Sequence, residues 1–242
     1  MFITLLKWAR RLFVTIWFWL GASLATVAMG LSVWISNAKT HDDITARIEN
    51  VMATFILRWM AIPGFWDVSF EVQKPVGNDV CYILAANHNS IIDTLFMALL
   101  PYHKTYSYNA KWGFVPIFGK MCKRAGYISI DLRTPESRRK VVPQIVDKIK
   151  RGYSIMYYPQ GSRSKTPELE IQPQDLKHGA FTAAIQSQAK ILPIKIVGSH
   201  KILRPWGIAD VGTVRVIRLP AFEVKDVQKG KEHFCSAMNK RV

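Results

Sequence analysis

The chain has 242 residues, and its 33 Lys and Arg against 17 Asp and Glu give a formal net charge of +16 at pH 7. This length suits one domain with a sizeable core plus a membrane element. The basic excess attracts polyanions, so nucleic acid and an anionic membrane surface are both candidate partners. Three widely spaced cysteines, Cys81, Cys122 and Cys235, exclude a disulfide framework or a cysteine metal site and fit a reducing compartment.

The first apolar stretch covers residues 12–35, which are 24 residues without a charged side chain, and it follows Lys7, Arg10 and Arg11. At about 1.5 Å per residue, a helix of this length reaches across a hydrocarbon core of ~30 Å. A cleaved signal peptide is the alternative, since small residues occur within the stretch, but its apolar region is usually only ~7–15 residues long. The sequence predicts a membrane helix whose basic flank stays on the cytosolic side, and this helix either spans the bilayer or enters one leaflet and turns near Gly30 without spanning.

A second apolar segment, residues 44–66, carries scattered charges and ends near Pro63-Gly64, a pair typical of a turn. Its apolar side chains recur with a helical period, which predicts an amphipathic helix. The side chains on this stripe are Ile44, Ile48, Val51, Met52, Phe55, Ile56 and Trp59. Two interpretations are open at this point: a core helix of a soluble domain, or a monotopic helix that returns the chain to the side from which it came.

From residue 67 onward, short apolar runs alternate with longer segments of helical period. Strands are expected at 68–72, 80–86, 105–109, 127–131, 154–158, 191–197 and 211–219, and helices at 92–100, 115–124, 135–151 and 175–189. Residues 159–173 lack a period and are expected to form a loop. This alternation predicts an α/β fold with a largely parallel central sheet flanked by helices, and functional loops beyond the carboxyl ends of the strands.

The segment 87–93, with the sequence NHNSIID, follows the apolar run at 80–86 directly. A strand that ends here would hold the imidazole of His88 rigidly, and a turn could fold Asp93 back onto it. A carboxylate bonded to one ring nitrogen fixes the tautomer, while the other nitrogen accepts a proton as a general base. The competing interpretation is a helix N-terminus with a capping residue and an ordinary histidine. Taken alone, this heptapeptide favours the second interpretation.

A second polar segment, 157–164 (YYPQGSRS), also follows an apolar run, and the two segments together resemble the glycerolipid acyltransferases that include 1-acylglycerol-3-phosphate acyltransferase. That family carries an Asn-His-x4-Asp block and a later Phe-Pro-Glu-Gly-Thr-Arg-Ser block. Between them, 126–133 (GYISIDLR) is similar to the family's Gly-led block ending in Ile-Asp-Arg. The later segments KHGAF at 177–181 and LPI at 192–194 also match. Four blocks in order, over about residues 80–200, carry the resemblance.

The resemblance implies a membrane-bound enzyme that transfers a fatty acyl group to a lysophospholipid hydroxyl. The implied acceptor is 1-acyl-glycerol-3-phosphate, giving phosphatidic acid, and the implied co-substrate is acyl-CoA or acyl carrier protein, with no other cofactor and no metal. His88 would be the general base and Asp93 would orient it. The expected substrate-binding residues are Gln160, Gly161, Ser162, Arg163, Arg133 and Lys177. Arg163 is the expected phosphate ligand, because its planar fork suits phosphate oxygens.

Three positions depart from the family pattern and bear on the acceptor. Gln160 stands where the family usually has Glu, so one charge is missing beside the acceptor site. Leu132 occupies the usual Arg position of the second block, with Arg133 one place later. Tyr158 and Ser162 replace Phe and Thr, which are mild changes. Another lysolipid, or glycerol phosphate, is the alternative acceptor.

The family's two-helix membrane element favours the monotopic interpretation of residues 44–66. The expected organisation is therefore a membrane element at 1–66 and an α/β acyltransferase domain at 67–242. The catalytic domain is expected on the cytosolic face of a bacterial inner membrane or of the endoplasmic reticulum, attracted to anionic lipids.

Other classes of protein explain parts of the sequence. Ser90 lies near His88, but no Gly-x-Ser-x-Gly elbow of a serine hydrolase occurs, so a turn or cap role is expected. Eleven Lys or Arg between 111 and 151 would suit nucleic acid, yet no recognition motif accompanies them, and no nucleic-acid partner is expected. A lipid-binding protein without catalysis is the remaining alternative, supported mainly by Gln160.

Overall fold

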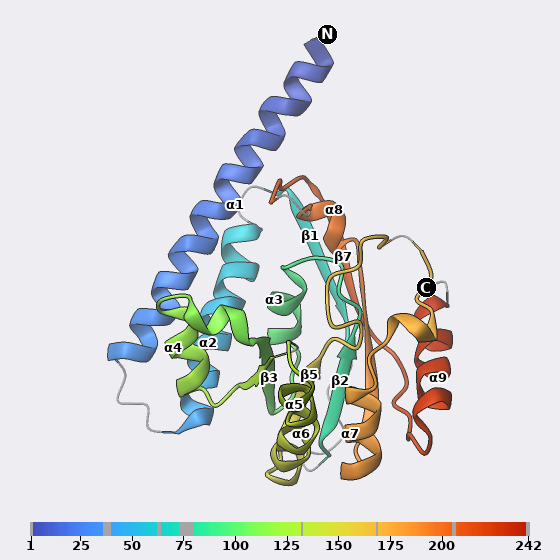
Figure 1. The fold of residues 1–242 in the computed structure, drawn as a ribbon. Coiled ribbons are helices and arrows are strands. Elements are labelled where there is room, and N and C mark those ends of the chain that lie inside the picture. The colour runs from blue at the N-terminus through green and yellow to red at the C-terminus, as the bar shows by residue number, and fades with distance from the viewer. Residues whose placement is uncertain are drawn as a thin grey trace. The chain divides into compact units, whose positions relative to one another are not determined.

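The computed structural model describes residues 2–35, 40–61, 64–72, 80–131, 133–167, 169–204 and 207–240, with side chains from residue 4 onward. Seven strands form a sheet in the order β1-β7-β6-β2-β5-β3-β4 (Figure 1). Their bounds are β1 Trp66–Glu71, β2 Tyr82–Ala86, β3 Lys104–Asn109, β4 Ile128–Ile130, β5 Ser154–Tyr157, β6 Lys190–Val197 and β7 Gly212–Arg218. The pairs β2·β5, β2·β6, β3·β5 and β3·β4 are all parallel. The predicted α/β fold with a largely parallel sheet is confirmed.

The helices agree with the predicted alternation but differ at several boundaries. They are α1 Phe2–Ile35, α2 His41–Thr54, α3 Asp93–Ala98, α4 Phe118–Arg124, α5 Pro135–Arg139, α6 Val141–Lys150, α7 Gly179–Ser187, α8 Ser199–Ile202 and α9 Val227–Asn239, with a π-helix η1 at Phe55–Met60 and 3-10 helices η2 at Ala110–Phe114 and η3 at Pro173–Asp175. The segment expected as one helix at 135–151 is two, and α8 and α9 were not predicted. The second apolar segment is helical only to Met60, because the chain enters β1 at Trp66. Pro63 of the predicted turn lies outside the described residues.

The chain forms two compact units. Unit 1 comprises residues 1–70, 89–100 and 196–216, and unit 2 comprises residues 71–88, 101–195 and 217–242. Each unit is described by itself below. The predicted division at residue 66 stays a prediction.

In unit 1, the helix α1 packs against α2 and η1 through aromatic rings. The rings of Trp17 and Trp59 are stacked with centroids 4.5 Å apart. Each indole N–H donates to the other residue's carbonyl, at 3.2 Å from Trp17 and 3.0 Å from Trp59. A Cβ at Gly21 would collide with the Trp59 ring, so only glycine allows this close approach. The helix pair is therefore held by specific contacts in addition to apolar burial.

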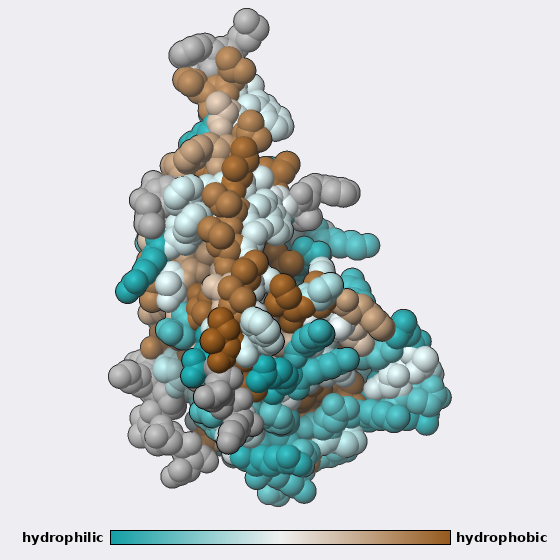
Figure 2. All heavy atoms as spheres, turned by 90° about the vertical axis from the view of Figure 1, so that its left-hand side faces the viewer, coloured by the Kyte–Doolittle hydropathy of each residue, from teal (hydrophilic) through white to brown (hydrophobic). Residues whose placement is uncertain are grey.

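The same helix has a buried face and an exposed apolar face. Val14, Phe18, Met29 and Val33 are buried. The exposed face carries Leu12, Phe13, Ile16, Trp19, Leu20, Leu24, Val27 and Leu31, and it forms the brown stripe of Figure 2. By length and composition, Thr4–Ile35 is the one helical segment among the described residues that could cross a membrane. The exposed apolar face agrees with the predicted contact between this helix and lipid.

Near its N-terminal end, α1 is tied to the loop before β7 by an ion-pair cluster. Asp210 accepts from Arg11 Nε at 2.7 Å and from Arg10 Nη2 at 3.3 Å, and its carboxyl is 9% exposed. Thr15 exchanges hydrogen bonds with the backbone of Ala209, and Trp66 Nε1 donates to the carbonyl of Asp210 at 2.7 Å. The two arginines expected only to orient the helix in the membrane therefore also fasten it to its own unit.

The core of unit 2 lies around its parallel strands β2 and β5. Ile83, Ala85 and Ile155 on these strands are fully buried, as is Phe181 on α7. The pairing places Ala85 opposite Tyr157 of β5. Because parallel strands run in one direction, the chain leaves β2 and β5 at the same edge of the sheet, and the segments that follow them are brought together there.

Candidate active site

His88 is placed by the ends of two neighbouring strands of unit 2. It follows β2 by two residues, and Tyr158 follows β5 directly. The two rings are stacked, with centroids 4.1 Å apart and an interplanar angle of 16°. The segments 87–93 and 157–164 are therefore in direct contact, although His88 and Tyr158 lie 70 positions apart in the chain. Stacking on a phenol ring restricts the rotation of the imidazole.

The backbone of His88 is fixed from both sides by the 157–164 segment. The His88 N–H donates to Gln160 Oε1 at 2.8 Å. The His88 carbonyl accepts from the Ser164 N–H at 2.7 Å. Gln160, expected as an acceptor ligand, thus positions the histidine. Ser164 was not singled out from the sequence, because its contact with His88 depends on the pairing of β2 with β5, which no local pattern gives.

The turn after Tyr158 brings a lysine beside the same segment. Gly161 has a φ of 73°, a conformation that L side chains rarely adopt. A Cβ there would meet Lys177 Cγ at 3.2 Å, and the Lys177 N–H donates to the Pro159 carbonyl at 2.7 Å. The Gly161 N–H itself donates to the Tyr158 carbonyl at 3.0 Å. That N–H is therefore used within the turn.

Asp93 lies in unit 1 at the start of α3 and is fully buried. Its Oδ2 accepts from the Asn89 N–H at 2.7 Å and from the Ser90 N–H at 2.8 Å. A turn therefore follows His88 and is closed by the aspartate itself, while the expected orientation of the imidazole by Asp93 stays a prediction. Two amide donors fix the carboxylate before any substrate binds.

Ser90 is used structurally in unit 1, as expected. Its hydroxyl donates to the Leu203 carbonyl at 3.0 Å, and the residue is 2% exposed. A buried hydroxyl with a backbone partner is poorly suited to attack a substrate. This geometry agrees with the turn role and gives no support to a serine nucleophile.

The three basic residues expected at the acceptor differ in their surroundings within unit 2. Arg163 and Lys177 both have exposed side chains. Arg163 lies on the 157–164 segment that holds His88, and Lys177 lies next to the turn at Gly161 in that segment. Arg133 is instead paired with Asp131, with Nη2–Oδ2 at 2.7 Å. The hydrogen bonds from Arg133 lower the pKa of Asp131 to about 2. Ser162 is exposed beside Arg163, and Leu132 lies outside the described residues.

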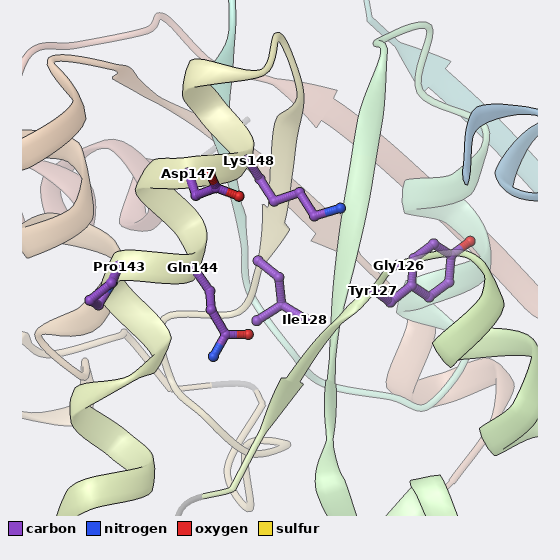
Figure 3. A pocket seen from close by; sticks show the side chains of 7 residues that line it. All are labelled: Gly126, Tyr127, Ile128, Pro143, Gln144, Asp147 and Lys148. Carbon is purple, nitrogen blue, oxygen red and sulfur yellow. The ribbon is translucent and has the colours of Figure 1, made fainter. Parts of the chain in front are cut away.

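A separate hollow of about 370 Å³ lies in unit 2 between β4 and α6. Its lining comes from Gly126, Tyr127, Ile128, Pro143, Gln144, Asp147 and Lys148 (Figure 3). None of the site residues predicted from the sequence lines it. Among the described residues, no cluster of three or more His, Cys, Asp or Glu could hold a metal ion.

Comparison with known proteins identifies several relatives. The chain is 28% identical to the chloroplastic 1-acyl-sn-glycerol-3-phosphate acyltransferase LPAT1 of Arabidopsis thaliana over 163 residues, which are 65% of this chain and 44% of the relative. It is 25% identical to the 1-acyl-sn-glycerol-3-phosphate acyltransferase of Saccharomyces cerevisiae over 153 residues, 62% of this chain and 50% of the relative. The matched region thus spans about half or less of these relatives.

The fold resembles a solved structure over almost its full length. The crystal structure of the 1-acyl-sn-glycerophosphate acyltransferase PlsC from Thermotoga maritima superposes with a TM-score of 0.73, covering 95% of this chain and 94% of that one at 17% identity. The family model described as Acyltransferase matches residues 67–197, more than half of the chain, and that range includes both motifs around His88. The chain therefore belongs to the acyltransferase family.

Proposed function

We propose that this protein transfers a fatty acyl group to the free hydroxyl of 1-acyl-glycerol-3-phosphate, producing phosphatidic acid. The observation that carries the proposal is the fixation of His88 by the 157–164 segment, through Gln160, Ser164 and the Tyr158 ring. A general base has to be held in one orientation beside the acceptor, and this segment also carries Arg163. The relatives named for this activity support the same acceptor.

In the proposed reaction, His88 takes the proton of the acceptor hydroxyl. The hydroxyl oxygen then forms a bond to the carbonyl carbon of the donor thioester, and the carbon–sulfur bond breaks. The leaving thiolate takes up the proton, so that an ester and a free thiol result. Asp93, five positions after His88, would orient the imidazole and stabilise its charged form. Its two amide donors hold the carboxylate in place, which limits the reorganisation that the step requires.

The acceptor phosphate would be bound by Arg163, with Lys177 as a second cation. Both side chains are exposed, and the Gly161 turn keeps Lys177 at the segment that carries Arg163. A guanidinium fork matches two phosphate oxygens, whereas an ammonium acts as a point charge. Arg133, held by Asp131, would contribute mainly to the surrounding positive field.

The donor would be acyl-CoA or an acyl carrier protein, reached from the cytosolic side, with α1 at the membrane. This arrangement is supported by the exposed apolar face of α1 and by the basic excess of the chain. Cytosolic donors and lipid acceptors meet at that surface, and anionic headgroups attract a basic protein.

Product analysis tests the activity. Purified full-length protein in detergent is incubated with acyl-CoA, or acylated carrier protein, and a panel of lysophospholipids and glycerol phosphate, and products are identified by mass spectrometry. We expect phosphatidic acid from 1-acyl-glycerol-3-phosphate, and none with a folded His88→Ala variant. Transfer only to an acceptor without phosphate would overturn the assigned acceptor. Lipid binding without transfer to any acceptor would favour the non-catalytic alternative.

A further inference from the structure

An exposed apolar patch lies in unit 2 on η2 and on the segment that joins it to α4. Trp112, Phe114, Val115 and Ile117 are 44%, 82%, 38% and 45% exposed, respectively. Phe114 is more exposed than Trp34 of α1, which is 75% exposed. Single exposed hydrophobic residues are common on soluble proteins, but four of them within six positions concentrate apolar surface on one short segment.

The backbone of this segment is held in a fixed and strained shape. Ile117 has a φ of 66°, which is unfavourable for a β-branched residue. The turn is closed by N–H donations from Val115 to the Trp112 carbonyl at 3.1 Å and from Gly119 to the Val115 carbonyl at 2.9 Å. A Cβ at Gly119 would collide with the Gly113 carbonyl, so α4 packs directly against η2. Strained backbone held by its surroundings is typical of functional segments.

The direction of the side chains follows from this packing. Phe118, the next residue along, is only partly exposed and meets the Tyr108 ring edge-on at 6.5 Å. The turn thus directs one aromatic ring inward and leaves the preceding ones outward. The exposed side chains are thus carried by a turn that is hydrogen-bonded and packed against its neighbours.

The charged residues next to the patch in the chain are all basic. Lys111, Lys120, Lys123 and Arg124 are exposed around it, and the Lys111 Nζ lies 5.6 Å from the centroid of the Trp112 ring. The sequence contains no acidic residue between Asp93 and Asp131. Aromatic and aliphatic side chains with a cationic rim suit the boundary between headgroups and acyl chains of an anionic bilayer.

From this combination we propose that the Trp112–Ile117 patch is a second membrane contact, by which unit 2 inserts into the headgroup region of an anionic lipid surface independently of α1. An acidic protein surface is the alternative occupant, and the lipid experiments below distinguish it, because a protein partner would not bury the patch in vesicles. This contact does not depend on the acyl transfer proposed above.

A fluorescent probe at position 114 tests the contact in the full chain. Phe114→Cys, in a Cys81→Ser background, is labelled with an environment-sensitive dye, and the protein is reconstituted into vesicles of phosphatidylcholine with phosphatidylglycerol. Burial raises the pKa of the remaining thiols, Cys122 to about 12 and Cys235 to about 11, so both stay protonated and react slowly. Ile185→Cys on α7, a helix without charged side chains, is the matched control.

We expect the emission of the probe at 114 to shift to the blue in these vesicles, with quenching by lipids brominated on the acyl chain and protection from iodide. The probe at Ile185, which is 37% exposed, should stay accessible to iodide. A probe at Val115 should behave like the one at 114. Equal iodide quenching at 114 and 185 would overturn the proposal.

The basic rim is tested by charge reversal and by lipid composition. Lys120→Glu with Lys123→Glu should reduce the blue shift of the probe at 114 in anionic vesicles, and pure phosphatidylcholine should give a smaller shift than the mixture. An equal shift in both lipids and in both proteins would refute the role of anionic headgroups. The probe reports how deeply position 114 lies in the bilayer. The test of the contact is therefore valid even if the enzyme uses another acceptor.

Discussion

At the scale of single residues, the strongest expectation concerns His88. Replacement by alanine removes the base but leaves the backbone bonds to Gln160 and Ser164, which involve only main-chain atoms of His88. We expect a loss of roughly 10²–10⁴-fold in kcat, typical of a general base, with little change in Tm. Steady-state kinetics and thermal unfolding of the same preparation measure both. Near-normal turnover in a folded His88→Ala protein would end the assignment.

Asp93 requires a different substitution, because it has a structural task as well. Asp93→Ala leaves the N–H groups of Asn89 and Ser90 without their acceptor, at about 1–3 kcal/mol for each buried group left unsatisfied. Loss of activity in that variant would not separate chemistry from folding. Asp93→Asn retains an oxygen acceptor and removes the charge. We expect it to keep most of the stability and to lose transfer, and full activity in Asp93→Asn would contradict the orienting role.

The Gln160 contact yields a prediction about the departure from the family pattern. Gln160→Glu keeps an oxygen that accepts from the His88 N–H, so the variant should remain active, with a change in preference among acceptors caused by the new charge. Gln160→Met removes the oxygen that accepts the hydrogen bond from the His88 N–H. This variant should have a lower kcat with every lysolipid substrate alike. Kinetics with phosphorylated and unphosphorylated lysolipids separate a change in substrate preference from a uniform loss of kcat. Full activity of Gln160→Met would show that the contact is dispensable.

Arg163 is tested by retaining its charge. Arg163→Lys loses the guanidinium fork, so KM for 1-acyl-glycerol-3-phosphate should rise by roughly 10-fold, equivalent to about 1.4 kcal/mol, with a smaller change for an acceptor without phosphate. Lys165→Arg, two positions further on, is a control that leaves the Arg163 side chain unchanged. Equal losses for both acceptors would make Arg163 structural.

At the scale of elements, the link between α1 and the loop before β7 predicts a pH-dependent stability. Burial tends to raise the pKa of Asp210, but the Val211 N–H and the side chain of Arg11 outweigh it, and the net pKa lies below 3.8. The stabilisation is therefore complete above about pH 5 and is lost as the pH falls through the lowered pKa. Asp210→Asn should cost about 1–2 kcal/mol near neutral pH, a value discounted because both arginines are partly exposed.

Thermal unfolding in detergent measures this effect. The difference in Tm between the native chain and Asp210→Asn should be largest at pH 6–7 and should shrink towards pH 3. A difference that stays constant over this range would exclude the ion pairs as its source. Asp131→Asn is a useful control, since the pKa of Asp131 is also lowered but by an exposed pair with Arg133.

Much of the fold could be predicted from the period of apolar residues in the sequence. The errors of that prediction have identifiable causes. The parallel strands explain why two motifs predicted separately meet at His88, since both follow strands that end at one edge. The helix α9 was missed because Gly230 interrupts its pattern. In the structure, a Cβ there would meet Val224 Cγ1 at 2.8 Å, so the glycine serves close packing. The roles of Gln160 and Asp210 depend on contacts between distant positions, which no local pattern reveals.

At the scale of the whole molecule, the expected cytosolic location of the catalytic domain is tested by chemical labelling. The expected cytosolic location places residues near the C-terminus on the side of the acyl donor. Lys240→Cys in a Cys81→Ser background should react with a membrane-impermeant maleimide only from the cytosolic face of sealed vesicles. Lys240 is exposed, whereas Cys122 and Cys235 are buried. Reaction only from the opposite face would refute the topology.

The link from Arg10 and Arg11 to Asp210 also has a consequence for how the chain is made. The two arginines emerge from the ribosome first, and their partner is synthesised about 200 positions later. Unit 1 consists of three separated stretches of chain, so it closes only after residues 196–216 exist. Domains tend to fold from the N-terminus during synthesis. Here the first helix must wait, with its arginines unpaired, until most of unit 2 has been translated. Unit 1 is therefore expected to close only after residue 216 has been made, and unit 2 is complete only after its last stretch, 217–242, has followed.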